Sequence, residues 1–116
     1  MKTKKAHDYS KYRFDGQLYG KSNLVLAIIM KHLENHPNAT MKELQEAFPK
    51  ESIETFGKAR KRSETYKRFF LENVLVTADK KIVVSNQWGK NNISKFLDAA
   101  KSNGYKIRHV EKQVAA

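Results

Sequence analysis

The most basic stretch of the sequence, residues 58–68, reads KARKRSETYKR. Six of its eleven residues are lysine or arginine and Glu64 is the only acidic one, which leaves a formal charge of +5. Ammonium and guanidinium groups at this density are what contact with nucleic-acid phosphates requires. They would equally suit an acidic protein partner, or a solvated surface that contacts nothing. The stretch therefore predicts a surface for polyanions and leaves the partner open.

The composition narrows the classes of partner. The 116 residues suffice for one domain, and a net charge of +11 favours nucleic acid or an acidic protein. The longest apolar run, residues 24–30, is far too short for a membrane span, so no membrane partner is expected. The first 14 residues contain no apolar core of a secretory signal, and we expect a cytoplasmic protein. The absence of cysteine excludes disulfides, thiol catalysis and the common structural zinc sites.

The elements that must position the basic stretch begin with a small hairpin. Residues 9–14 and 17–19 are predicted to pair across the Asp15-Gly16 turn. A first helix is expected over about 24–35, where apolar residues cover almost the whole circumference. Such a helix should be central and contacted from several sides.

Residues 40–43, TMKE, form a capping box, which predicts a short second helix of about eight residues that Pro49 stops. A third, imperfect helix is expected over 50–65, with Ser52 as a candidate cap. Three apolar residues at helical spacing, Ile53, Phe56 and Ala59, would face inward. The basic residues of this helix would then lie on its outer side.

The rest of the chain is predicted to form a hairpin and a last helix. Residues 66–77 and 82–85 should be extended segments around a polar turn at 78–81. The last helix, capped by Asn91 or Asn92, should carry one apolar face and end at Asn103-Gly104 in the left-handed manner. A short edge strand is expected at 105–107.

Three helices followed by a hairpin is the element order of a winged helix. The expected fold class is therefore α+β and winged-helix-like, with about four helices, a β-hairpin wing and short edge strands. In such a domain the third helix enters the major groove and the wing contacts the backbone or the minor groove. A single domain is expected over 9–110, with flexible tails at 1–8, which is basic, and 111–116.

Eight cations fall on the expected third helix, at the start of the wing or at its tip. We expect them to hold nucleic acid, most simply double-stranded DNA, through its phosphates, while Ser52, Thr55 or nearby amides add base contacts. The alternative is a protein-interaction module, phage or defence related, whose basic face docks on an acidic partner protein. The oligomeric state stays open. The candidate nucleic-acid-binding residues are Lys58, Arg60, Lys61, Arg62, Lys67, Arg68, Lys80 and Lys81.

Other motifs do not add up to catalysis, and an enzyme is not expected. Gly20-Lys21-Ser22 resembles the end of a phosphate-binding loop, but only three residues separate Gly16 from Gly20 where the motif needs four. The acidic residues are spread along helix surfaces and nominate no acid–base pair. His32 and His36 share a helix face at a metal-compatible spacing, yet no third ligand is evident, so a solvent-facing helix end is the favoured interpretation. No metal or cofactor is predicted.

Trp88, the only tryptophan, lies in a dense cluster of amides. Amides can read base edges and an indole can stack on bases, which would make a recognition loop. The favoured interpretation is structural, with the amides satisfying the backbone at a strand-to-helix corner and the indole packing beneath. The amides are those of Asn86, Gln87, Asn91 and Asn92.

The closing segment carries a family resemblance. Residues 82–89, IVVSNQWG, are followed by Asn92-Ile93, Phe96, Ala99-Ala100, Gly104-Tyr105 and Ile107. This series resembles small bacterial domains of uncharacterised function that end in NQWG…NI…F…A…GY…I. Matches in the front half extend the resemblance over about residues 9–107. It implies a bacterial or phage source and a structural part for residues 86–89, but no catalytic or binding residue.

Overall fold

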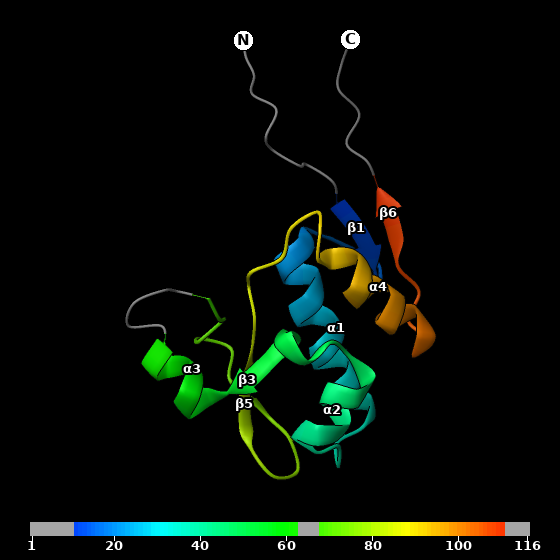
Figure 1. Ribbon diagram of the computed structural model, residues 1–116. Coiled ribbons are helices and arrows are strands. Elements are labelled where there is room, and N and C mark those ends of the chain that lie inside the picture. The colour runs from blue at the N-terminus through cyan, green and yellow to red at the C-terminus, as the bar shows by residue number, and fades with distance from the viewer. Residues whose placement is uncertain (1–10, 63–67, 111–116) are drawn as a thin grey trace, which may run out of the picture.

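The computed structural model describes residues 11–62 and 68–110 (Figure 1). These residues contain four α-helices and six strands, and the strands form two small antiparallel sheets. The mixed α+β class is therefore confirmed. The tails expected at 1–8 and 111–116 lie outside the described residues. None of the described helices is both long and apolar enough to cross a bilayer.

The first sheet is built on the predicted hairpin. Strand β1 (Lys11–Phe14) pairs with β2 (Gln17–Tyr19) across a turn in which Asp15 and Gly16 have φ angles of 53° and 82°. This left-handed pair matches the twist of the flanking strands, which is why Asp-Gly is a strong hairpin signal. Strand β6 (Arg108–Val110) pairs with the other edge of β1, three residues beyond the predicted start of the edge strand.

Helix α1 (Lys21–Asn35) is the central helix, with Leu24, Val25, Ile28 and Ile29 fully buried. It packs on both strands of the hairpin, on the second sheet and on the last helix. The prediction of a central helix contacted from several sides is confirmed, although not all of its apolar residues are covered, since Met30 is 45% exposed.

Helix α2 (Met41–Ala47) begins at the predicted capping box. The Glu43 backbone N–H donates to Thr40 Oγ1 at 3.1 Å, and the Thr40 backbone N–H donates to Glu43 Oε1 at 2.9 Å. Two amides at the helix start thus gain partners within four residues of sequence. Leu44 anchors the helix in the core.

The predicted third helix over 50–65 is wrong in its first half. A 3-10 turn, η1 (Lys50–Ser52), leads into strand β3 (Ile53–Thr55), and helix α3 (Phe56–Arg62) follows without a gap. Ser52 does not cap a helix, since its buried hydroxyl makes no hydrogen bond among the described residues. Segment 53–55 is extended because it pairs with a strand some 30 residues later.

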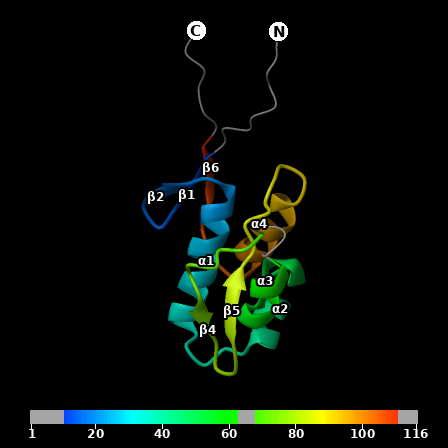
Figure 2. The ribbon, with the colours of Figure 1, turned by 90° about the vertical axis from the view of Figure 1, so that its left-hand side faces the viewer.

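The second sheet has the strand order β3-β5-β4. Its strands β4 and β5 form the predicted hairpin. Strand β4 (Leu75–Val76) is much shorter than expected. Strand β5 (Lys81–Val84) is the central strand, and its residues 82–84 are fully buried. Figure 2 shows β4 and β5 side by side, with α3 on the far side of β5 from β4.

Helix α4 (Ile93–Ser102) packs against α1 and buries Ile93, Phe96 and Ala100 in the core. The Phe96 ring stacks on Phe48 with centroids 5.1 Å apart, which joins α4 to the end of α2. The left-handed ending is confirmed at Gly104, whose φ is 91°. Asn92 occupies the N-cap position as predicted, but its side chain does not cap the helix.

Candidate nucleic-acid interface

Helix α3 carries three cations of the basic stretch whose side chains the structure describes. Its seven residues make about two turns. Ala59 is fully buried and packs toward the β3-β5-β4 sheet, whereas Lys58, Arg60 and Lys61 are exposed. Because the inward residue is small, the helix lies close to the sheet and keeps its long basic side chains in solvent.

Arg60 is oriented by its own helix. Its guanidinium carbon lies 5.9 Å from the centroid of the Phe56 ring, one turn earlier. An exposed cation–π contact of this kind is worth about 0.5–1 kcal/mol. It restricts the side chain while the N–H donors at the guanidinium edge stay available for a phosphate.

The hairpin tip supplies the second group of cations, Lys80 and Lys81, both exposed. The turn is organised by Thr77, whose Oγ1 accepts from the Lys80 backbone N–H at 2.9 Å and donates to Asp79 Oδ1 at 2.9 Å. Asp79 Oδ1 also accepts from the backbone N–H of Met41 at 3.1 Å. The tip is thereby tied to the start of α2.

The carboxylate of Asp79 is stabilised in its charged form at this tip. The hydrogen bond from the Met41 backbone is the main cause that lowers the pKa of Asp79, and the Thr77 hydroxyl adds to it. A second backbone bond, from the Ala78 N–H to the Ala39 carbonyl at 2.8 Å, reinforces the attachment. These hydrogen bonds fix the backbone of the hairpin tip from which Lys80 and Lys81 project.

The second sheet places the start of α3 and the hairpin tip at the same end of β5. Thr55, the last residue of β3, pairs with Ile82, so α3 begins beside the end of β5 that carries Lys81. Within residues 11–62 and 68–110, none of the ammonium groups on α3 and at the tip forms an ion pair with a carboxylate. The four lysines of these two groups thus carry their charge without an ion pair to a described carboxylate, although Lys80 lies close enough to Asp79 to help lower the pKa of that carboxyl.

Three of the eight candidate residues are placed less fully. Arg68 is exposed, and its backbone carbonyl accepts from the Asn86 N–H at 2.9 Å. Arg62 is the last residue of α3, but its side chain lies outside what the structure describes, as does the whole of Lys67.

The residues suggested for base contacts are less accessible than the cations. Ser52 is fully buried, which argues against it as a base contact, and Thr55 is half-buried at the end of β3. Direct reading of bases by these two residues is therefore a weak part of the candidate site.

Trp88 and Asn92, the centre of the amide cluster, use their hydrogen-bonding groups within the cluster. Trp88 Nε1 donates to the Ser85 carbonyl at 2.8 Å, and its ring lies 5.4 Å from Phe96. Asn92 Oδ1 accepts from the Gly89 N–H at 2.7 Å, while its Nδ2 donates to the Gln87 carbonyl at 2.8 Å. These bonds form a corner between β5 and α4 and favour the structural interpretation.

His32, in α1, and His36, directly after its last residue, differ in environment, which sequence spacing did not indicate. His32 is buried, whereas His36 is exposed, and the two rings lie 4.4 Å apart. His32 Nδ1 is 2.7 Å from the Tyr105 hydroxyl. Burial and, secondarily, the nearby His36 lower the pKa of His32. No group of three candidate metal ligands exists in the described part of the chain.

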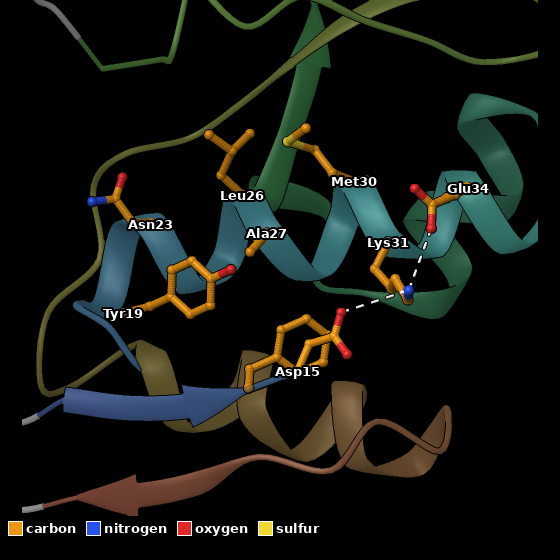
Figure 3. Close-up of a pocket in the computed structure, with 9 residues that line it drawn as sticks. Asp15, Tyr19, Asn23, Leu26, Ala27, Met30, Lys31 and Glu34 are labelled. Atoms are coloured by element: carbon orange, nitrogen blue, oxygen red, sulfur yellow. Dashed lines mark hydrogen bonds and ion pairs between the residues drawn. The ribbon is translucent and has the colours of Figure 1, made fainter. Parts of the chain in front are cut away.

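A groove of about 450 Å³ along α1 is a feature that the sequence interpretation missed. Figure 3 shows it between the β1–β2 hairpin and the helix, with Tyr19 on one side and Met30 on the other. Lys31 lies at one end, 3.6 Å from Asp15 and 3.3 Å from Glu34. The sequence signal for such an open side is the unbroken apolar run at residues 24–30, which places apolar side chains all round the helix.

Comparison of the chain with protein-family models, with curated proteins and with solved structures finds no match. The resemblance of the closing segment to small bacterial domains therefore stays a prediction, and function has to be argued from the geometry.

Proposed function

We propose that the chain is a nucleic-acid-binding module that holds double-stranded DNA mainly through its phosphates. The contact elements are α3 and the tip of the β4–β5 hairpin. The observation that carries the proposal is the group of exposed cations, without ion pairs to described carboxylates, that follow from one end of a single sheet. The net charge of +11 adds long-range attraction for a polyanion.

A winged-helix arrangement is part of this proposal. The order α1, α2, α3 and then the β4–β5 hairpin supports it. Two features are specific to this chain: β3 intervenes between α2 and α3, and the hairpin tip is hydrogen-bonded to the start of α2. With only about two turns, α3 offers few side chains to a groove, so phosphate contacts should dominate over base contacts.

The proposal has a quantitative consequence for salt. Each phosphate neutralised by a lysine or arginine releases counterions, which contributes a slope of about −0.9 to a plot of log affinity against log salt. Lys58, Arg60, Lys61, Lys80 and Lys81 are exposed in the described residues. If all five contact phosphates, the slope should be about −4 to −5. No catalytic step is part of the proposed function.

The test is a fluorescence-anisotropy titration with a random duplex of about 25 base pairs, at salt concentrations from about 50 to about 200 mM. The double variant Lys58→Glu/Lys61→Glu should bind at least about 10-fold more weakly than the natural chain at the lowest salt. Its slope should be less steep by about 2, because two phosphate contacts are lost.

The matched control is Lys95→Glu/Lys101→Glu, which makes the same charge change at two exposed positions of α4. The control should keep most of the affinity and the full slope. Equal losses in both variants would contradict the proposed interface, since binding would then follow net charge alone. A protein of this charge that binds no duplex at low salt would instead direct the search to an acidic protein partner.

A further inference from the structure

A second basic surface lies on the β2-β1-β6 sheet. One face of this sheet covers the core, since Tyr12 and Phe14 are buried. The other face is open, and the alternate residues of β1, Lys11 and Arg13, are exposed on it. Successive side chains of a strand point to opposite faces, so these two cations share the outer face.

The register of the sheet brings a second arginine directly beside Arg13. Arg13 pairs with Arg108 of β6, and on its other side with Leu18 of β2. Residues directly opposite in antiparallel strands lie on the same face with Cβ atoms about 5 Å apart, and like charges in such positions repel. Lys11 lies about 7 Å further along β1. Three cations thus occupy one small area.

No described carboxylate compensates this charge. In the segments 11–62 and 68–110, Lys11, Arg13 and Arg108 form no ion pair. Among the described residues, the acidic residue nearest to Arg13 in sequence is Asp15, whose carboxylate lies 3.6 Å from the Lys31 ammonium. The remaining titratable side chain of β6, His109, lies against Tyr12 with ring centroids 5.0 Å apart and so belongs to the inner side.

We propose that this outer face is a second phosphate-binding surface, which takes the sugar–phosphate backbone of nucleic acid independently of α3. Two guanidinium groups on adjacent strands can grip one phosphate through paired N–H donors, and Lys11 can reach a neighbouring one. An anion between the two arginines also removes their mutual repulsion. The repulsion between Arg13 and Arg108 is therefore relieved only when an anion is bound between them.

The surface is distinct from the one proposed above. Figures 1 and 2 both show the β2-β1-β6 sheet at one end of the molecule and α3 with the second sheet toward the other. The chain then has two phosphate-contacting ends, which lets it hold two segments of nucleic acid or two separate stretches of one.

The register offers a variant in which stability and binding should move in opposite directions. Arg13→Glu places a carboxylate directly opposite Arg108, which replaces repulsion by attraction across the strands. The melting temperature should be unchanged or higher. Phosphate binding should fall, because one cation is removed and the other is neutralised. The magnitude of the salt slope for duplex binding should decrease by about 2.

The control with the same charge change is Lys101→Glu on α4. A slope for Arg13→Glu no different from that of this control would overturn the proposal. Should Arg13→Glu lower the melting temperature, the uncharged, strand-compatible variant Arg13→Thr/Arg108→Thr gives the same test. Its slope should also decrease by about 2.

Repeating Arg13→Glu in the Lys58→Glu/Lys61→Glu background separates the two surfaces. We expect residual duplex binding in that background, which Arg13→Glu then weakens further, with an additional decrease of about 2 in the magnitude of the slope. If only the α3 changes alter the slope, the sheet surface is refuted and the α3 interface stands. If only Arg13→Glu alters it, the reverse holds. Binding to phosphatidylserine vesicles that Arg13→Glu abolishes, with no change in the duplex slope, would also overturn the proposal in favour of a lipid surface.

Discussion

His32 is the residue at which three segments far apart in sequence meet. It belongs to α1, its ring contacts Phe48 at the end of α2 with centroids 5.1 Å apart, and its Nδ1 meets the Tyr105 hydroxyl beyond α4. Its other close titratable neighbour is His36. Burial and, secondarily, the adjacent imidazole disfavour a second proton, so folding lowers the pKa of His32 and favours its neutral form.

This environment predicts a loss of stability in mild acid. The pKa of His32 is lowered from 6.5 in the folded state, so the unfolded chain binds a proton more readily. Stability is then greatest above that ordinary value, decreases as the pH falls below it, and levels off once the pH is below the folded pKa. Urea unfolding at about pH 7.5 and about pH 5.5 measures the difference.

His32→Asn should be less stable at both pH values, because a buried ring is lost, but the decrease between them should largely vanish. His36→Asn is the control, and it should retain most of the decrease. A decrease of equal size in His32→Asn and in the natural chain would show that other groups cause it.

The predictability of individual residues follows the range of their interactions. The capping box at Thr40 and the turn at Asp15-Gly16 are confirmed because their hydrogen bonds and backbone angles are set within four residues. The burial of His32 was not predicted, because its partner Tyr105 lies 73 positions away. Helical spacing places the two histidines on one face but does not say what covers that face.

Among the elements, the β4–β5 hairpin has its tip fixed by a side chain rather than by the strands alone. Strand β4 contains only two residues, yet Asp79 joins the turn to the first residue of α2. The carboxylate accepts from a backbone N–H that has no partner within the helix. The position of Lys80 and Lys81 therefore depends on Asp79.

Asp79→Ala should release this attachment. The Met41 amide should exchange its hydrogen faster, while the Glu43 amide, held by the Thr40 side chain, should stay protected. Asp79→Asn, which keeps an acceptor oxygen, should have the smaller effect.

The attachment should also depend on pH. Because the pKa of Asp79 is lowered, the contribution of its carboxylate to stability is complete above the ordinary value of 3.8 and is lost as the pH falls through the folded pKa. Hydrogen exchange followed by NMR checks both points, and equal protection of Met41 in all three proteins would contradict them.

The elements that sequence patterns failed to predict are those made by distant pairing. Ile53, Phe56 and Ala59 have helical spacing, but residues 53–55 form a strand because β5 is available beside them. β-Branched residues at 53 and 55 are compatible with either outcome. The helices with strong local signals, α1, α2 and α4, were predicted close to their observed bounds, and the order of elements was correct apart from β3.

At the scale of the whole molecule, the chain carries two exposed basic surfaces and a net charge of +11. Such a charge destabilises the compact state through self-repulsion and attracts polyanions over long distances. Salt and nucleic acid should therefore both stabilise the fold, but by different routes. Salt screens charges with a length of about 30 Å at 0.01 M and about 10 Å at 0.1 M, whereas nucleic acid stabilises by binding only the folded state.

Thermal unfolding separates these routes. Raising the salt from about 10 to about 100 mM should increase the melting temperature of the protein alone. At the lower salt, duplex DNA at about 100 times its dissociation constant should contribute about 2.7 kcal/mol, which corresponds to a rise of roughly 10 °C or more for a domain of this size. Added salt should remove most of the duplex effect because it weakens phosphate contacts.

The variant Lys58→Glu/Lys61→Glu should reduce the stabilisation by duplex and leave the melting temperature without DNA unchanged or higher. A chain that salt stabilises and duplex does not would have charge without a binding surface, and both proposed interfaces would fail together.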